Sequence, residues 1–385
     1  MLTQDTNPEL FLRGIFREYY QKWDPMPVDL IHQREIGFVP FMGTMIRHRA
    51  LSGMNDLRAF AQRNIPRHFY YSTSYYRYPD RRVMSEKEWM GAELIFDLDA
   101  DHIKLGGTPR YDEILEKVKE HTIRLLERFL LDDLGFSEND LLVTFSGGRG
   151  YHIHVKADSV YGLSSDSRRE IANYVRGEGI DGTSSPSGMR DGSVILGIWR
   201  KSIDTAFTNL FSGDPDELVA ELQKMFGDGR KSSPYLLRLK KTAIPHEGKS
   251  KFLIFSKPGP EKYSNMDDDD RMVLGRVISK VRESIMCEID EPVTTDIHRL
   301  IRMPGSLHGK TGLMVVPIKP SEIHGFDPLF TCRSPTMSGK TLKISLQKPY
   351  QIKFGGEMWT LREGEESVPL DLGVFLIAQR VAKLV

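Results

Sequence analysis

The segment from residue 92 to residue 155 constrains the fold more than any other part of the chain, because its secondary-structure signals follow one another without a break. In AELIFDLD, at its start, apolar and acidic side chains alternate as they do on a half-buried strand. Apolar residues then recur at helical spacing, and two short apolar runs flank a glycine-rich turn. The expected elements are a strand at 92–99, a helix at 111–131 and strands at 141–145 and 151–155. This order predicts an α+β or mixed α/β fold.

The rest of the chain divides into a core and an insertion. Between residues 162 and 250, two helical patches are separated by loops rich in Gly, Ser and Pro, such as GTSSPSG. We therefore expect a core formed by residues 1–161 and 251–385, with mixed β-sheets flanked by helices, and a helical insertion subdomain at 162–250. Further expected elements are helices at 11–22, 168–176, 215–226, 271–285 and 370–385, an extended segment at 69–76 and short strands within 311–354.

Composition excludes little about binding partners. Lys+Arg and Asp+Glu both total 53, so the formal net charge of the 385-residue chain is zero. Nucleic-acid-binding domains usually carry a basic excess, but residues 34–82 hold nine arginines against three acids, interleaved with tyrosines. That mixture suits phosphates and bases, and it equally suits a solvated face above tyrosines of the core.

We predict neither a secretory signal nor a membrane span. The N-terminus MLTQDTNPEL lacks the basic start and apolar core of a signal peptide, and no apolar run reaches the roughly 18 residues that cross a bilayer. The two cysteines, Cys287 and Cys332, offer no disulfide framework, and a reducing compartment is the simpler assumption.

The first candidate site is the pair Asp97 and Asp99 at the end of the 92–99 strand. A period of two places both carboxylates on one face, where two hard oxygen ligands can hold Mg²⁺ or Mn²⁺ while substrate phosphates and water complete the shell. The alternative is that these aspartates only begin a solvated loop.

The second candidate site is SGGRGYHIH, from Ser146 to His154. Its three glycines allow backbone N–H groups to approach and cradle a phosphate, and Arg149 adds a guanidinium fork that matches phosphate oxygens. His152 and His154 share one face of the following strand. The alternatives are a tight β-turn and a satisfied histidine face; zinc is a weaker interpretation because two histidines stand without a nearby cysteine.

The third candidate site is DEPVTTDIHRLIRMPGSLHG, residues 290–309. It can bring a third carboxylate to a metal and cations to a triphosphate. The alternative, which would be favoured if this segment stood alone, is a charged connection between a helix and a loop. Three carboxylates that bind one or two metal ions, with Arg, His and Lys that bind a triphosphate, are the groups that two-metal nucleotidyl transfer requires. The acidic run 267–270 instead precedes an apolar-periodic stretch and is predicted to begin a helix.

Five segments in order resemble the archaeo-eukaryotic primase family, and its small catalytic subunit in particular. They are REIGF at 34–38, PRHFYYSTSYY at 66–76, LIFDLDADH at 94–102, SGGRGYHIHV at 146–155 and RLIRMPGSLHGKTGL at 299–313. The resemblance covers most of the chain. It implies a primase catalytic core with mixed β-sheets flanked by helices, plus a helical subdomain that the 162–250 insertion fits.

The resemblance also implies roles for particular residues. The metal-binding and catalytic set would be Asp97, Asp99 and Asp290, with Asp296 as the second choice for the third carboxylate. The nucleotide-binding set would be Ser146, Arg149, His152, Arg302, His308 and Lys310. Relatives often carry a Cys/His zinc knuckle after the DxD strand, but this chain has no cysteine between Asp101 and Met286, so no zinc site is predicted there.

The implied activity is template-directed synthesis of short primers from nucleoside triphosphates on single-stranded DNA, with Mg²⁺ or Mn²⁺ as cofactor and pyrophosphate as product. The implied partners are a primase large subunit, in a heterodimer, and the template; the expected location is the cytoplasm at the replication fork, or the nucleus of a eukaryote. A stand-alone primase-polymerase and an end-joining polymerase of the same superfamily remain alternatives. A non-enzymatic nucleic-acid-binding subunit and a metal-dependent phosphoesterase account for fewer of the motifs.

Overall fold

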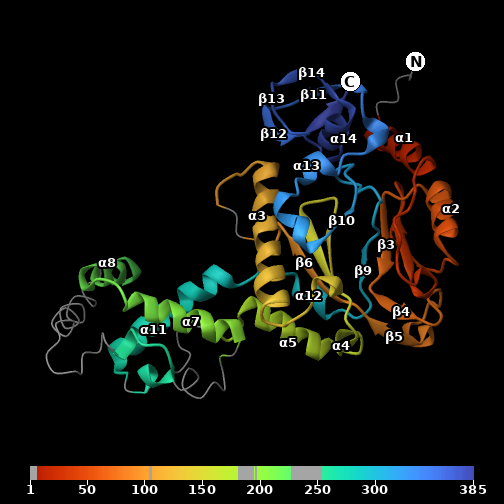
Figure 1. Ribbon diagram of the computed structural model, residues 1–385. Coiled ribbons are helices and arrows are strands. Elements are labelled where there is room, and N and C mark those ends of the chain that lie inside the picture. The colour runs from red at the N-terminus through yellow and green to blue at the C-terminus, as the bar shows by residue number, and fades with distance from the viewer. Residues whose placement is uncertain (1–6, 104–105, 181–194, 196, 227–253, 265) are drawn as a thin grey trace. The chain divides into compact units, whose positions relative to one another are not determined.

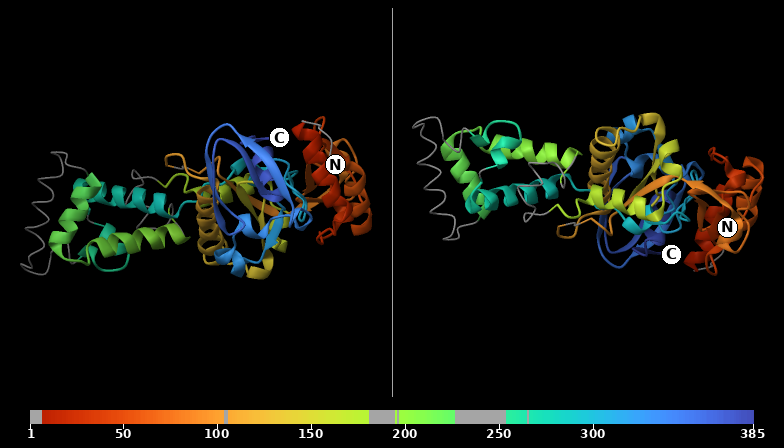
Figure 2. Two further views of the ribbon diagram at one scale, coloured as in Figure 1. Left: turned by 90° about the horizontal axis from the view of Figure 1, so that it is seen from above. Right: turned by 90° about the horizontal axis from the view of Figure 1, so that it is seen from below.

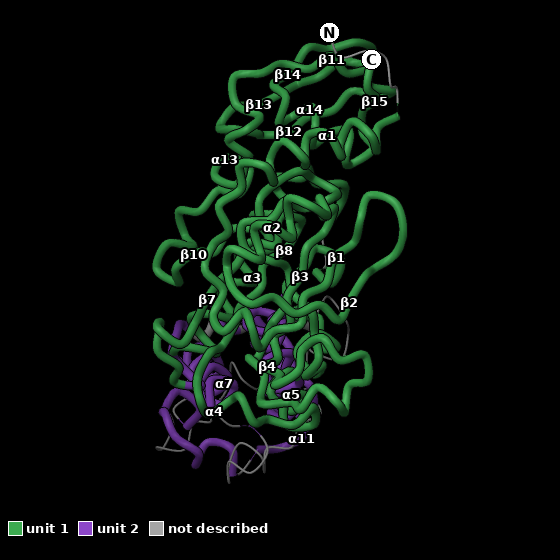
Figure 3. Tube along the Cα trace, turned by 90° about the vertical axis from the view of Figure 1, so that its right-hand side faces the viewer, with its two compact units in different colours: residues 1–131, 135–172, 288–385 green, residues 132–134, 173–287 purple. Residues whose placement is uncertain are grey.

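The computed structural model describes residues 7–103, 106–180, 195, 197–226, 254–264 and 266–385 (Figure 1). The chain forms two compact units (Figure 3). The first comprises residues 1–131, 135–172 and 288–385, and the second comprises residues 132–134 and 173–287. The mixture of antiparallel sheets and helices confirms the expected α+β class.

The centre of the first unit is a four-stranded antiparallel sheet in the order β10-β7-β8-β6. Its strands are β6 (Leu94–Asp99), β7 (Leu141–Phe145), β8 (Gly150–Val155) and β10 (Val316–Ile318). α3 (Tyr111–Arg124) continues into a π-helical turn at Leu125–Leu131 and packs along β8 and β6 (Figure 1). The strands and helix expected between residues 92 and 155 are therefore confirmed to within two residues, apart from the π-helical end of α3.

A second four-stranded sheet has the order β2-β1-β3-β9. Its strands are β1 (Ile36–Val39), β2 (Ile46–Arg49), β3 (His68–Ser72) and β9 (Leu300–Arg302). α1 (Pro8–Gln21) and α2 (Met54–Asn64) pack against each other beside this sheet, as both views of Figure 2 show in red and orange. The extended segment expected at 69–76 is interrupted, because β4 (Ser74–Tyr76) leaves β3 to pair with β5 (Trp89–Ala92).

The C-terminal part of the first unit is mostly β structure. β11 (Thr341–Leu346) pairs with β14 (Gly364–Pro369) and β15 (Ala382–Leu384), and β12 (Tyr350–Phe354) forms a hairpin with β13 (Glu357–Leu361). The helix expected at 370–385 is wrong in nearly its second half: α14 (Leu370–Ala378) ends before Arg380, whose φ is +61°. The residues beyond it pair with β11, and that pairing overrides the local helical pattern.

Shorter helices complete the first unit. They are α4 (Asp158–Tyr161), the start of α5 (Ser165–Arg176), α12 (Glu291–Thr295) and α13 (Pro328–Thr331). Short 3₁₀ turns lie at Ile31–Gln33, Met84–Lys87, Glu138–Asp140, Pro320–Gly325 and Pro335–Met337.

The second unit is helical in its described part. α7 (Gly197–Leu210) buries Trp199, Ile203 and Phe207 at four-residue spacing and packs against α11 (Asp268–Ile285), while α8 (Pro215–Phe226) follows α7. The acidic run does begin a helix: the Asp267 carboxylate accepts from the Asp270 N–H at 2.9 Å, and the Asp270 carboxylate accepts from the Asp267 N–H at 3.0 Å.

The observed division differs from the expected core at 1–161 and 251–385 with an insertion at 162–250. α11 belongs to the helical unit because it packs against α7, whereas the sequence boundary places it in the core. The expected boundary at 250 and the GTSSPSG loop lie outside the described residues. Within the described part of the chain, no helix is long and apolar enough to cross a membrane.

Candidate active site

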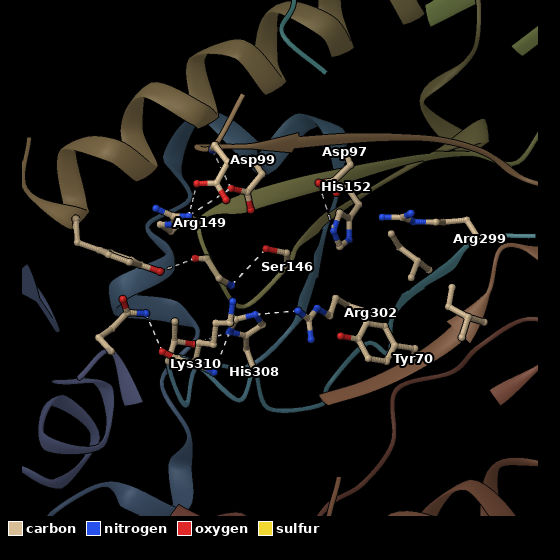
Figure 4. A pocket seen from close by; sticks show the side chains of 17 residues that line it. Tyr70, Asp97, Asp99, Ser146, Arg149, His152, Arg299, Arg302, His308 and Lys310 are labelled. Atoms are coloured by element: carbon tan, nitrogen blue, oxygen red, sulfur yellow. Dashed lines mark hydrogen bonds and ion pairs between the residues drawn. The ribbon is translucent and has the colours of Figure 1, made fainter. Parts of the chain in front are cut away.

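A pocket of about 510 Å³ lies beside the edge strands β6 and β9 of the two four-stranded sheets. Eight of the nine residues predicted as site residues line it (Figure 4). They are Asp97, Asp99, Ser146, Arg149, His152, Arg302, His308 and Lys310. The three motifs that sequence analysis singled out therefore meet in one place, although Asp97 and Lys310 are 213 positions apart in the chain.

Strand β6 presents the two aspartates to the pocket. The apolar side chains Leu94, Phe96 and Leu98 are fully buried on the other face of the strand. Asp97 and Asp99 alternate with them, and their side chains are 19% and 33% exposed. The expectation that both carboxylates share one face is confirmed. The strand ends here because the backbone turns: the Asp99 carboxylate accepts from the N–H of Asp101 at 3.1 Å.

The structure places Asp290 next to Asp97. Asp290 is the N-cap of α12, a short helix that packs on β6, and its backbone N–H donates to the Asp97 carbonyl at 2.9 Å. Asp296 is exposed at the other end of α12, where its carboxylate accepts from the N–H of His298 at 2.8 Å. Asp290 is not part of the pocket lining itself, but its charge reaches Asp97.

Negative charge accumulates around Asp97. Burial raises the pKa of the Asp97 carboxyl to about 7, with further contributions from the charges of Asp99 and Asp290 that outweigh the opposing effect of Arg299 and Arg302. Ionisation of Asp97 therefore costs more free energy than ionisation of a solvent-exposed aspartate, and a cation bound beside it would lower that cost.

The glycine-rich turn between β7 and β8 fits tightly against the loop that carries His308. Gly147 has a φ of +77°, and a Cβ at this position would lie 2.7 Å from the Cβ of His308. The Thr311 hydroxyl donates to the Gly147 carbonyl at 2.5 Å, and the Tyr111 hydroxyl donates to the Gly148 carbonyl at 2.8 Å. Glycine is the residue that permits this approach at a positive φ, so the turn is fixed against the loop that carries His308.

Two side chains of this segment face the aspartates. The Arg149 guanidinium donates to Asp101 at 2.5 Å and lies 4.0 Å from the Asp99 carboxylate. His152 is opposite Asp97 in the β6–β8 register, with its Nε2 3.6 Å from Asp97 Oδ1, while its buried Nδ1 has no hydrogen-bond partner. Burial, with the charges of His154 and Arg302, holds the pKa of His152 well below its usual range, so the ring is neutral.

Arg302 is held between two histidines. Its Nη1 lies 2.5 Å from His68 Nδ1 and its Nη2 lies 3.0 Å from His308 Nε2, while its guanidinium covers the ring of Tyr70 at 4.7 Å. Because a guanidinium only donates, both ring nitrogens must accept, and both histidines are neutral. Burial and the charge of Arg302 lower the pKa of His68 to about 2 and hold that of His308 well below its usual range.

Sequence analysis did not assign several residues that line the pocket. They are Tyr70, Asp101, Tyr111, Arg299, Thr311 and Gln379. It also left His68 without a role. His68 and Tyr70 were visible as alternate residues of the PRHFYY motif. Gln379, whose amide donates to the Lys310 carbonyl at 2.7 Å, follows α14 and had no sequence signal.

Comparison with known proteins identifies the family of the chain. A family profile described as DNA primase small subunit matches residues 96–320, a range that contains all nine predicted site residues. A protein of Picrophilus torridus named DNA primase small subunit PriS is 40% identical over 374 residues, covering 96% of each chain. Proteins of the same name from Thermoplasma volcanium and Methanothrix thermoacetophila are each 34% identical, over 98% and 99% of this chain and 98% and 100% of their own lengths.

Proposed function

This chain belongs to the family of DNA primase small subunits, and from that membership we propose that it is the catalytic subunit of a primase. It joins nucleoside triphosphates into short primers on a single-stranded DNA template and releases pyrophosphate. The observation that carries the proposal is the pocket in which Asp97 and Asp99, with Asp290 beside them, face the cations Arg149, Arg302 and Lys310.

The acidic side of the pocket fits a divalent cation. Asp97, Asp99 and Asp290 would hold Mg²⁺ or Mn²⁺, because a dication would offset the burial and the repulsion by Asp99 and Asp290 that together raise the pKa of Asp97. Among the described residues no group of three or more His, Cys, Asp or Glu side chains is arranged to hold a metal ion by itself, so substrate phosphates and water would have to complete the shell. A bound ion would lower the pKa of the attacking 3′-hydroxyl and stabilise the leaving pyrophosphate.

The basic side of the pocket fits a triphosphate. Ser146 and the N–H groups of the glycine-rich turn approach phosphate oxygens closely, while Arg149 and Lys310 supply positive charge at the same end of the pocket (Figure 4). The neutral rings of His152 and His308 act as hydrogen-bond partners rather than as charges. Arg302 is oriented by His68 and His308 before substrate arrives, which lowers the entropic cost of binding.

The partners follow from the names of the relatives. A small subunit implies a large one, and we propose a heterodimer with a primase large subunit that works on single-stranded DNA at the replication fork, in the cytoplasm of an archaeal cell. The near-complete coverage of proteins named small subunit favours this assignment over a stand-alone primase-polymerase or an end-joining polymerase.

The test is primer synthesis on circular single-stranded DNA with free nucleotides, Mg²⁺ or Mn²⁺ and no added primer, with and without a co-purified large subunit. Circular template offers no 3′ end, so any labelled product must have been started anew. The Asp97→Asn variant is the matched control, because it keeps the side-chain shape and removes the charge. A wild-type chain that extends primers but starts none, even with its partner, would contradict the assignment as a primase.

A further inference from the structure

The pocket contains four cationic side chains that differ in how they are held. Arg149 pairs with Asp101, and Arg302 lies between two neutral histidines. Arg299 and Lys310 also line the pocket. Neither makes a hydrogen bond or an ion pair through its side chain with any residue that the structure describes. A cation without a protein partner in a pocket is available to an anionic ligand.

These two cations lie toward opposite ends of the pocket. In Figure 4, Lys310 and Arg149 lie on one side, Arg299 lies on the other, and Asp97 and His152 lie between. The charge of Arg299 lowers the pKa of both Asp97 and His152, so it acts on the acidic centre of the site. The buried Nδ1 of His152, which has no partner, lies in the same part of the pocket.

The chemistry of nucleotidyl transfer distinguishes the two ends. The bond that forms joins the 3′-oxygen of the acceptor nucleotide to the α-phosphorus, and the bond that breaks joins that phosphorus to the bridging oxygen of pyrophosphate. Pyrophosphate leaves with the bonding electron pair, and the hydroxyl proton passes to solvent. Attacking and leaving oxygens lie roughly in line on opposite sides of the phosphorus. If the triphosphate occupies the end with Arg149 and Lys310, the acceptor must enter from the end with Arg299.

We propose that Arg299 binds the 5′-phosphate of the acceptor nucleotide, the nucleotide whose 3′-hydroxyl attacks. During initiation this phosphate belongs to the first nucleoside triphosphate, and during extension it is the last phosphodiester of the primer. A guanidinium suits both because its planar fork matches two phosphate oxygens. The inference rests on the proposed function and adds a second nucleotide subsite to it.

The backbone of Arg299 is fixed independently of its side chain. Its N–H donates to the Asp296 carbonyl at 3.2 Å, and its carbonyl accepts from the Thr73 N–H at 2.9 Å and from the Thr73 hydroxyl at 3.3 Å. The side chain is half-buried, and the structure gives it no hydrogen bond or ion pair with a described residue. Replacement of the guanidinium by an amide in Arg299→Gln should therefore leave the fold intact.

The experiment separates the acceptor from the incoming nucleotide. On a poly(dT) template, adenosine or adenosine 5′-monophosphate is the acceptor, and 3′-deoxyadenosine triphosphate is the incoming nucleotide. The latter lacks a 3′-hydroxyl, so only one bond forms and each KM belongs to one subsite. A parallel series uses deoxyadenosine or deoxyadenosine 5′-monophosphate as the acceptor and dideoxyadenosine triphosphate as the incoming nucleotide. The variants are Arg299→Gln, Arg299→Lys as the charge-retaining control, and Lys310→Gln as the control at the triphosphate end.

We expect the wild-type protein to use the phosphorylated acceptor with a KM about tenfold to a hundredfold lower than that of the nucleoside, the range of one charge-assisted hydrogen bond. Arg299→Gln should abolish this preference and leave the KM of the incoming triphosphate unchanged. Arg299→Lys should restore part of the preference, and Lys310→Gln should raise only the KM of the triphosphate. The assignment of Arg299 is overturned if Arg299→Gln still prefers the phosphorylated acceptor. It is also overturned if Arg299→Gln raises only the KM of the incoming triphosphate. A wild-type protein that joins no nucleotides with or without its partner overturns the proposed function, and this inference with it.

Discussion

The Thr311 hydroxyl joins the two turns that face the substrate. Thr311 is 1% exposed; its Oγ1 donates to the Gly147 carbonyl at 2.5 Å and accepts from the Leu313 N–H at 3.1 Å. The His308 Nδ1 lies 3.4 Å from the same oxygen. Nε2 of His308 faces the Arg302 guanidinium, which can only donate, and Nδ1 also lies 3.4 Å from the Lys310 backbone nitrogen.

We predict that Thr311→Val lowers both stability and nucleotide affinity. Valine has nearly the same shape but leaves the Gly147 carbonyl and the Leu313 N–H buried without this partner. Each unsatisfied buried group costs about 1–3 kcal/mol, and partial relaxation should bring the total to roughly 2–4 kcal/mol in the free energy of unfolding. The KM of the triphosphate should rise at the same time, since the ring of His308 loses the partner that orients it.

The assay compares denaturant unfolding and the KM of the triphosphate in three variants. Thr311→Ser keeps the hydroxyl and should retain the KM while losing about 1 kcal/mol for one methyl group. Thr294→Val is the matched control, because Thr294 is equally buried but its hydroxyl has no hydrogen-bond partner. If Thr311→Val were as stable as Thr294→Val and bound nucleotide normally, the reasoning about this hydroxyl would be refuted.

Four further outcomes are expected. Asp97→Asn should abolish nucleotide transfer and yet raise stability at pH 8 by on the order of 1 kcal/mol, because an ionised carboxyl with a raised pKa destabilises the folded state above the unfolded pKa; unfolding curves and primer assays measure both. Glu93→Gln should lower the free energy of unfolding by about 3–5 kcal/mol, since it leaves Arg34 buried without a counter-charge. Asp267→Ala should cost about 1 kcal/mol of stability as a lost helix cap, whereas Asp268→Asn at an exposed position should change it by less than about 0.5 kcal/mol, both without effect on primer synthesis. Elemental analysis of the purified chain should find no stoichiometric zinc, because the sequence offers no cysteine between Asp101 and Met286, where relatives often carry a zinc knuckle.

Elements with a strong local pattern were predicted well from the sequence. β7 was placed residue for residue because acidic and glycine-rich segments bound its apolar run, and α8 was placed equally well. The C-terminal helix was extended too far because Val381 continues the helical spacing of Leu372, Phe375 and Leu376, whereas residues 382–384 pair with β11 as a strand. Local patterns contain no information about such pairing, and the boundary of the helical unit was missed for the same reason.

The candidate site was only partly accessible to sequence analysis. Asp97, Arg149 and His308 stand in motifs whose composition already indicates phosphate and metal chemistry. The role of His68 was not visible, because its partner Arg302 lies 234 residues further along the chain. Likewise, Arg299 looked like one more charge in a charged segment until its position in the pocket and its lack of a protein partner were known.

The pocket requires a fixed relation between two sheets, since β6 supplies its aspartates and β9 supplies Arg302. A buried ion pair joins the two sheets: Arg34, just before β1, donates to Glu93, just before β6, at 2.5 Å, and neither side chain is exposed. Arg34 also donates to the Ser72 carbonyl on β3 at 2.8 Å. A buried ion pair rarely stabilises a fold more than well-packed apolar residues would. We infer that it serves to define how the sheets meet, and so to place β6 opposite β9. Arg34 does not line the pocket, yet it begins REIGF, one of the five segments in which the sequence resembles the primase family.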